Sequence, residues 1–408
     1  MAVKEGYKQT EVGVIPEDWE CLQLGDVGKS IIGLTYKPSD VSDWGILVLR
    51  SSNIDDNVLK FDDNVFVDLS VSENLITRKG DILICVRNGS RDLIGKCAII
   101  EEESEGHTFG AFMSIFRSSL GGYLFNVFQS DIIKKQINRH LGATINQITN
   151  RSLNSFYVPI PESKKEQKAI ATALSDMDGL INSLSKLIEK KKNIKQGAMQ
   201  ELLTGKKRLD GFSGEWVEVK VSSFGEIITG STPPTNNHEY WNGEIPWVTP
   251  TDIKDKKYIY KSERNITKKG LSVIRQLKAN SILVTCIASI GKNAILKNVG
   301  ACNQQINAII PNISHASDFI YYLFENNKQY LQSKAGITAT NIVSKNIFSE
   351  MLFIVPPTIE EQTAIATILS DMDSEIENLQ TKLDKYKAIK QGMMQELLTG
   401  RIRLLEGA

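Results

Sequence analysis

The sequence predicts an α+β protein in which two pseudo-two-fold-related units of mixed β-strands and helices are separated by two long antiparallel coiled-coil helices. Three observations lead to this prediction. A stretch of 40 residues occurs twice, its apolar residues follow a seven-residue repeat, and a second, more diverged unit precedes each copy. At 408 residues, the chain is long enough for two or three domains with ample core.

The repeated stretch predicts one long helix in each half of the chain. Residues 166–205 return at 361–400, an offset of 195, with 26 of the 40 positions identical and no gap. A repeat of fixed period is the first feature that a fold must explain. The S/T-x-x-E spacing of a capping box, in which each side chain reaches the backbone N–H of the other, begins both copies: Ser163 with Glu166, and Thr358 with Glu361. Each helix is expected to be roughly 60 Å long.

Apolar residues in both stretches alternate four and three apart, which is the seam of a coiled coil. The seam residues are Ile170, Leu174, Met177, Ile181, Leu184 and Ile188 in the first copy, and Ile365, Leu369, Met372, Ile376, Leu379 and Leu383 in the second. So long a stripe needs a partner, and the other copy is the nearest one. Two halves of one chain that close through a pseudo-two-fold axis run their helices antiparallel. The alternative is two unrelated amphipathic helices, each packed on its own domain.

The segments before the two helices form a second, more diverged repeat. GDILICV from Gly80 matches NSILVTC from Asn280, and other short, β-branched segments fall in the same order in both halves. Such segments, bounded by Gly, Asn, Pro or Ser, are typical of strands and turns. Helices that must match each other stay alike, whereas units that bind different things are free to diverge.

The sequence contains no set of residues that predicts catalysis. No nucleophile, base and oxyanion donors can be assembled, no glycine-rich turn or Asn/Asp-Pro-Pro-Tyr/Phe motif for S-adenosylmethionine is present, and the four histidines lack metal-ligand spacing. The five cysteines lack a C-x-x-C pair and are interpreted as reduced cytosolic thiols. No apolar run is long enough for a signal peptide or a membrane span. We therefore expect a cytoplasmic, non-catalytic binding protein with no metal.

Several motifs resemble the specificity subunit of type I restriction-modification systems. They are the repeated E-Q-x-x-I-A…S-x-M-D…K-Q-G-x-M-Q-x-L-L-T-G-x-x-R-L helix, the opening TEVGVIPEDW and the tandem arrangement, and they span essentially the whole chain. The resemblance implies two target-recognition domains, each of which reads one half of a gapped, asymmetric site in double-stranded DNA. The domains are expected at 1–160 and 206–355, and the conserved helical regions at 161–205 and 356–408.

The resemblance also implies partners and their cofactors. The helices are expected to dock two modification subunits, which carry N6-adenine methyltransferase chemistry, and the assembly is expected to recruit restriction subunits. S-adenosylmethionine, ATP and Mg²⁺ would then belong to those partners, and none to this chain. Because the net charge is zero, we expect the chain alone to bind DNA weakly and to depend on its partners for much of the phosphate contact.

Polar loops at matching positions are the candidates for base contact, because Arg forks onto guanine and Asn onto adenine in the major groove. In the first unit they are Thr35, Tyr36, Lys37, Arg87, Asn88, Ser90 and Arg91, with Thr144, Asn146 and Gln147 as further choices. In the second unit they are Thr232, Asn236, Asn237, His238, Tyr240, Ser289 and Lys292, with Thr338, Thr340 and Asn341 as further choices. A solvated loop or a turn cap is the alternative for each residue.

Two other functions remain open from the residues alone. One is a non-catalytic adaptor that uses two modules to bind protein partners. The other is the recognition half of a type IIB/IIG-like restriction-modification enzyme. Salt-dependent binding to duplex DNA separates the adaptor from a DNA-binding protein.

Overall fold

The computed structural model describes residues 4–141, 146–254, 256–335 and 341–404. The chain divides into two compact units. Unit 1 comprises residues 1–185 with 382–408, and unit 2 comprises residues 186–381. Each unit therefore contains one part of each long helix, and a globular part built from one half of the chain.

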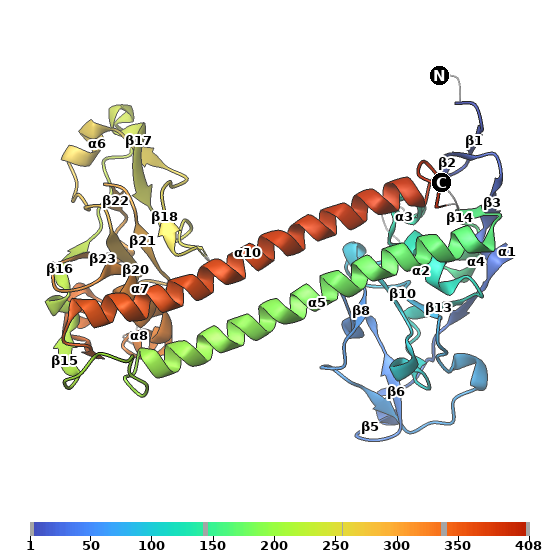
Figure 1. The fold of residues 1–408 in the computed structure, drawn as a ribbon, viewed down its shortest axis with the longest axis horizontal. Helices are drawn as coiled ribbons and strands as arrows, with labels where there is room; N and C mark the ends of the chain where they lie inside the picture. Colours follow the sequence, from blue (N-terminus) through green and yellow to red (C-terminus); the bar gives the residue numbers. More distant parts are fainter. Residues whose placement is uncertain (1–3, 142–145, 255, 336–340, 405–408) are drawn as a thin grey trace. The chain divides into compact units, whose positions relative to one another are not determined.

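The long helices are α5 (Lys164–Leu202) and α10 (Ile359–Leu397), each of 39 residues (Figure 1). In unit 2, Lys191 forms an ion pair with Glu375, and Lys195 forms one with Asp373. The partner number falls as the α5 number rises, so the two helices are antiparallel. In unit 1, the beginning of α5 and the end of α10 pack into one hydrophobic core. Antiparallel helices bring these two ends together. The predicted antiparallel fold is confirmed.

The predicted seam residues are buried most completely where the helices meet the globular parts. Those with low exposure are Ile170, Leu174, Ile181, Leu184, Ile188, Ile365, Leu369 and Leu383. Met177, Met372, Ile376 and Leu379 are half-buried. The lysines that interrupt the seam, Lys195 and Lys390, form ion pairs with Asp373 and Asp178.

Unit 1 contains strand pairs and two small sheets on which short helices pack. Its strands are β1 (Tyr7–Thr10), β2 (Gly13–Pro16), β3 (Trp19–Gln23), β4 (Lys29–Ile32), β5 (Val41–Ser42), β6 (Ile46–Leu49), β7 (Ile54–Asp55), β8 (Val58–Leu59), β9 (Phe66–Val67), β10 (Ile82–Cys85), β11 (Cys97–Ile99), β12 (Thr108–Phe109), β13 (Met113–Arg117) and β14 (Tyr157–Pro161). Its short helices are α1 (Leu24–Val27), α2 (Gly121–Gln129), α3 (Asp131–His140) and α4 (Asn150–Asn154). The four-stranded sheets have the orders β11-β10-β13-β4 and β12-β6-β9-β5.

Unit 2 repeats this arrangement with longer strands. Its strands are β15 (Val217–Lys220), β16 (Gly225–Thr229), β17 (Trp241–Val248), β18 (Tyr258–Ile259), β19 (Asn265–Ile266), β20 (Ser281–Thr285), β21 (Asn293–Leu296), β22 (Ala301–Cys302), β23 (Ile306–Pro311) and β24 (Leu352–Val355). Its short helices are α6 (Lys268–Ser272), α7 (Ser317–Asn326), α8 (Lys328–Ser333) and α9 (Lys345–Glu350). The sheet orders are β16-β23-β20-β21-β18 and β19-β17-β22, beside the pair β15-β24.

Two pairs of short helices, α2 with α3 and α7 with α8, are each separated by a single residue. Ser130 ends α2 in an extended conformation, and its hydroxyl accepts a hydrogen bond from Ile132 N at the start of α3. Asn327 separates α7 from α8, but it is not extended and its side chain does not cap α8. Apolar spacing does not reveal such a break, because both helices of each pair pack into one core. Among the described residues, no helix is long and apolar enough to cross a membrane.

The capping boxes predicted at the starts of α5 and α10 form only in part. Ser163 Oγ accepts from Glu166 N at 3.4 Å, but the Glu166 carboxylate accepts from Arg403 Nε at 2.6 Å and from Trp19 Nε1 at 3.3 Å. Glu361 likewise accepts from Arg208 and Trp216. These glutamates are 1% exposed, so the carboxylate satisfies a buried cluster rather than a free N–H.

We call these two groups the carboxylate clasps: clasp 1 is Glu166, Arg403 and Trp19, and clasp 2 is Glu361, Arg208 and Trp216. They are equivalent residue for residue, because Glu166 and Glu361, like Arg208 and Arg403, are 195 positions apart. Each clasp ties the segment that follows one long helix to the first turn of the other. In unit 1, this joins the C-terminal segment to the chain at Trp19 and Glu166.

Candidate nucleic-acid interface

A three-residue turn occupies the same place in both units. In unit 1, β12 pairs parallel with β6, and residues 110–112 then lead into β13. In unit 2, β22 pairs parallel with β17, and residues 303–305 lead into β23. We call these the unit 1 turn and the unit 2 turn. They are Gly-Ala-Phe and Asn-Gln-Gln, so one topological position carries different chemistry in the two units.

A glycine fixes each turn against the strand that pairs with β13 or β23. A Cβ added to Gly33, just after β4, would lie 2.2 Å from Gly110 O. A Cβ added to Gly230, just after β16, would lie 2.1 Å from Asn303 O. Only glycine allows this approach of two backbones. Gly33 and Gly230 therefore position the turns that lie against them.

In unit 2, the turn borders a cavity of about 440 Å³ that is open to solvent. Its lining includes Trp247 and Thr249 at the end of β17, Arg264, Ser289 after β20, and Asn303 and Gln305 of the turn. Backbone and side-chain amides, hydroxyls and a guanidinium thus converge on one hollow. This combination can hydrogen-bond to a polar ligand that enters from the surface.

Arg264 is held at this cavity by aromatic rings. Its guanidinium carbon lies 3.8 Å from the ring centroid of Trp241 and 5.2 Å from that of Trp247. The two indoles pack edge to face at 5.1 Å, and both are buried. Both tryptophans belong to a hydrophobic cluster of unit 2. Stacking orients the guanidinium without using its N–H groups.

In unit 1, the turn itself carries an aromatic ring, and an arginine from another segment lies against it. Phe112, in the unit 1 turn, is 56% exposed, and the Arg87 guanidinium lies 5.0 Å from its ring centroid. Arg87 also forms a β-bridge with Gln147. Asn88 donates to Ser51 Oγ at 3.3 Å, and Asn146 donates to Gly89 O at 3.2 Å. The segments 87–89 and 146–147 therefore lie side by side, and Arg87 from the first lies against the exposed Phe112 ring.

The other predicted base contacts of unit 1 have different surroundings from one another. Arg91 donates to Leu141 O at 2.9 Å and to Asn138 O at 3.3 Å, so it holds the end of α3. Ser90 N donates to Asn88 Oδ1, which makes Ser90 part of a local turn. Thr35, Tyr36 and Lys37 follow Gly33 in a segment that lies beside the unit 1 turn, because Leu34 forms a β-bridge with Gly110. Thr144 lies outside the described residues.

In unit 2, only part of the predicted set lies near the cavity. Ser289 lines it, and Thr232 donates to Gln304, the central residue of the turn, at 2.6 Å. Asn237 accepts from Glu239 N and caps the short 3₁₀ turn that contains His238 and Tyr240. Asn236, Lys292 and Asn341 are exposed. Thr338 and Thr340 lie outside the described residues.

The sequence prediction missed Phe112 in unit 1, and Thr249, Arg264, Asn303 and Gln305 in unit 2. One signal was available: Asn303-Gln304-Gln305 interrupts two apolar, strand-like segments. Arg264 gave no such signal, because its two aromatic partners lie 23 and 17 residues earlier in the chain (264 − 241 and 264 − 247). Only the fold of β17 and the following loop brings these side chains together.

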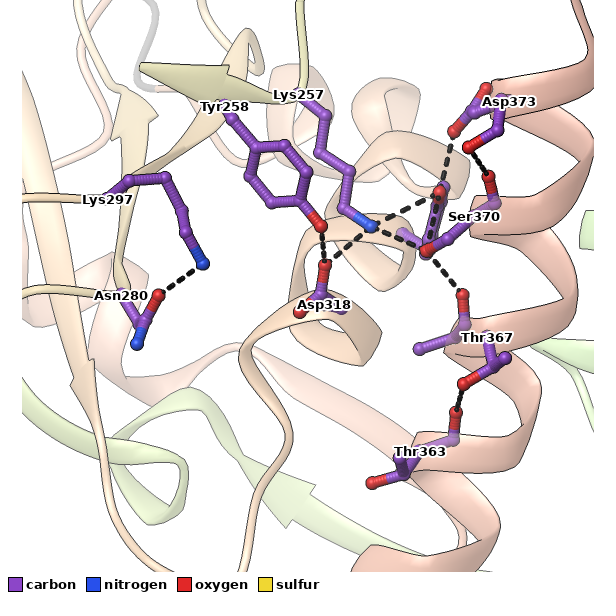
Figure 2. A network of polar contacts seen from close by, with 12 residues as sticks. Lys257, Tyr258, Asn280, Lys297, Asp318, Thr363, Thr367, Ser370 and Asp373 are labelled. Atoms are coloured by element: carbon purple, nitrogen blue, oxygen red, sulfur yellow. Dashed lines mark hydrogen bonds and ion pairs between the residues drawn. The ribbon is translucent and has the colours of Figure 1, made fainter. Parts of the chain in front are cut away.

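A polar network attaches the globular part of unit 2 to α10 (Figure 2). Lys257 Nζ lies 2.5 Å from Asp318 Oδ1 and donates to Ser370 Oγ at 2.7 Å. Tyr322 donates to Asp373 at 2.6 Å, and Lys195 of α5 pairs with the same carboxylate. Burial lowers the pKa of Lys257 below its ordinary value, although Asp318 opposes this. We call this group the unit 2 anchor.

Groups of His, Cys, Asp and Glu that could hold a metal ion do not occur among the described residues. The cysteines are free thiols, and burial raises the pKa of Cys286 to about 11 and that of Cys97 and Cys302 to about 12. Such thiols are poor nucleophiles at neutral pH.

Comparison with known proteins identifies the family. Residues 16–196 and 213–387 match the family described as Type I restriction modification DNA specificity domain, and the chain belongs to that family. This confirms the resemblance seen in the sequence. It also confirms the prediction that the chain is a DNA-specificity component rather than a catalytic subunit.

Two curated relatives come from Methanocaldococcus jannaschii. The chain is 28% identical over 426 residues to the putative type I restriction enzyme MjaX specificity subunit, covering 98% of this chain and 97% of the relative. It is 39% identical over 170 residues to the type I restriction enzyme MjaIX specificity subunit, covering 40% of this chain and 39% of that relative. The second similarity therefore spans well under half of each protein.

Solved structures show the same fold. The S subunit of a type I restriction-modification system from M. genitalium has a TM-score of 0.62 and 14% identity, over 98% of both chains. A chain from a study of assembly and conformational transition of a type I R-M system has a TM-score of 0.58 and 15% identity, over 95% of this chain and 99% of that one.

Proposed function

We propose that the chain reads a bipartite, asymmetric DNA site with an unread spacer, and that unit 1 and unit 2 each read one half. The observation that carries this proposal is the contrast between equivalent positions. The clasps match residue for residue, whereas the unit 1 and unit 2 turns differ at every residue. Surfaces that read the same bases would have no reason to diverge while their attachments stay fixed. The proposed domain boundaries remain 1–160, 161–205, 206–355 and 356–408.

A domain exchange tests the modular reading. Residues 206–355 are replaced by the matching segment of a relative with a different target, and the methylated motif is determined by sequencing DNA modified by the reconstituted complex. We expect a new sequence in one half of the site and no change in the other half. A change in both halves would refute the proposal that each unit reads independently.

The partners proposed for this chain are two modification subunits, together with restriction subunits in the full complex. The modification subunits would bind S-adenosylmethionine, and the restriction subunits would use ATP and Mg²⁺. An exposed apolar stripe on α5 supports docking of a partner: Leu180, Leu187 and Ile194 are spaced seven apart, and each is 38–47% exposed. We place the complex in the cytoplasm, with the DNA that it is proposed to modify.

A substitution on this stripe tests the docking surface. Leu187→Lys should weaken co-purification with the modification subunit, because it places a charge within an apolar contact. Glu189→Gln is the matched control, since it also raises the net charge by one but lies about 200° around the helix from Leu187. Equal retention of the modification subunit by both variants would place the docking surface elsewhere.

DNA binding by the chain alone should be weak, because the net charge is zero. It should fall with added salt, because each Lys or Arg contact with a phosphate releases counterions. Gel shifts with a cognate duplex, with and without modification subunits, measure this. Tight site-specific binding by the isolated chain would show that the partners are not needed for phosphate contact.

A further inference from the structure

The unit 2 cavity carries an inference that rests on the proposed function and deepens it. We propose that Arg264 and Gln305 form a specificity site for the major-groove edge of a guanine, in the half-site that unit 2 reads. The two side chains come from different segments and line the same cavity of about 440 Å³. Both present hydrogen-bond donors there.

The orientation of the Gln305 amide is set by the backbone. Gln305 N donates to Asn303 Oδ1 at 3.1 Å, which fixes the Asn303 amide with its oxygen toward that N–H. The Asn303 Nδ2 group then donates to Gln305 Oε1 at 2.9 Å. The Gln305 oxygen is therefore engaged within the turn, and its NH₂ group is the end left for a ligand. Among the residues that the structure describes, that NH₂ group has no hydrogen-bond partner.

Arg264 supplies the second donor. Its guanidinium stacks on Trp241 at 3.8 Å, and none of its N–H groups has a partner within the described part of the chain. A stacked arginine with free N–H groups is preorganised, because the rings restrict its rotamers before a ligand arrives. In most surface ion pairs, by contrast, a carboxylate already occupies this fork.

Two donors select a base edge that offers two acceptors. In the major groove, guanine presents N7 and O6 as acceptors, whereas adenine presents one acceptor beside an amino donor, and cytosine presents an amino donor. Thymine offers one acceptor beside a methyl group. Glu263 also lines the cavity, and its carboxylate is the acceptor that the amino group of the paired cytosine requires. The chemistry of the cavity therefore matches a G·C pair.

The unit 1 turn carries different chemistry at the position of Gln305, as expected if the two units read different bases. Phe112 occupies the place of Gln305, so the amide donor is replaced by an exposed ring. Arg87 lies against that ring but comes from the segment after β10, whereas Arg264 comes from the segment before β19. The two units would thus approach their bases from different sides.

The test uses the complex reconstituted with modification subunits and a library of duplexes that varies at every position of the site. Arg264→Ala and Gln305→Glu are compared with Lys268→Ala, which removes one positive charge from the same unit at a residue that does not line the cavity. We expect Arg264→Ala to reduce discrimination for one guanine of the unit 2 half-site by about 10- to 100-fold. Gln305→Glu exchanges donor for acceptor and should shift the preference at that position toward cytosine or adenine. Lys268→Ala should leave the motif unchanged.

Three outcomes would overturn the assignment. One is a wild-type unit 2 half-site that contains no G·C pair. The second is uniform weakening across all sequences by Arg264→Ala, since that identifies a phosphate contact. The third is an unchanged motif in both Gln305→Glu and Arg264→Lys, a variant that keeps the charge but loses the planar fork. Failure of the proposed function is distinct, because it appears in the domain exchange as a change in both halves.

Discussion

Unit 1 and unit 2 have the same residue types in their clasps and in the ion pairs between the long helices, but different residues in their turns. Clasp 1 and clasp 2 use the same three residue types, and the ion pairs Asp178–Lys390 and Asp373–Lys195 are related by the same offset of 195. The unit 1 turn is Gly-Ala-Phe, whereas the corresponding unit 2 turn is Asn-Gln-Gln. A buried carboxylate without its partner is costly, whereas an exposed turn can change with little effect on folding. Buried charged contacts tolerate less change than exposed turns, so the clasps are the same in both units and the turns are not.

The clasps give the largest expected effect on stability. Arg403→Met leaves Glu166 buried at 1% exposure without its bidentate partner, and also releases Asp18, which Arg403 contacts at 2.7 Å. We expect a loss of about 3 kcal/mol in the free energy of unfolding, measured by denaturant titration. Arg208→Met should cost less, because Arg208 contacts no second carboxylate among the described residues. Equal losses would mean that Asp18 contributes nothing to the difference between the clasps.

The second largest loss of stability is expected for a substitution of the buried lysine of α10. Lys390 is 7% exposed and lies 2.7 Å from both Asp178 and Gln129. Lys390→Met should destabilise the protein by about 2 kcal/mol, because it removes the charge partner of Asp178 and a hydrogen bond to Gln129. The double variant Lys390→Met with Asp178→Leu should recover part of this loss, and a double-mutant cycle measures the coupling. Strict additivity would show that the pair does not stabilise unit 1.

The unit 2 anchor predicts a pH dependence. Burial lowers the pKa of Lys257 below 10.5, so between the folded pKa and 10.5 the unfolded chain binds more protons than the folded one. The free energy of unfolding should therefore rise with pH in that window, and Lys257→Met should remove this rise. Unfolding curves of both proteins from pH 8 to 10.5 give the difference. A rise of the same size in the variant would assign it to other groups.

The exposed ring of the unit 1 turn gives the smallest effect on stability. Phe112 is 56% exposed, so Phe112→Ala should change the free energy of unfolding by less than about 0.5 kcal/mol. DNA binding by the reconstituted complex should nevertheless fall, because the ring is lost at the proposed contact surface and Arg87 loses the ring that it lies against. Calorimetric unfolding measures the effect on stability, and gel shifts on the same preparation measure the effect on DNA binding. Unchanged affinity would remove the unit 1 turn from the interface.

Part of the site was predictable because it lies within short stretches of sequence. Arg87, Asn88, Asn146 and Gln147 were expected in polar loops, and the structure places these two loops side by side, with Arg87 against Phe112. Arg91 was expected in the same role, but it holds the end of α3. Sequence spacing places a residue on a loop, yet the direction of its side chain depends on partners that are distant in the chain.

By itself, the sequence determined the two long helices, their antiparallel pairing and the repetition of a mixed α+β unit. These properties depend on periodicity and on an internal repeat, which are local or can be compared within the chain. The tertiary structure alone decided that Glu166 and Glu361 close the clasps instead of completing capping boxes, and that Arg264 meets Gln305 at one cavity. Burial and the geometry of distant segments fix those contacts, because a carboxylate or a guanidinium binds whichever partner the fold brings within reach.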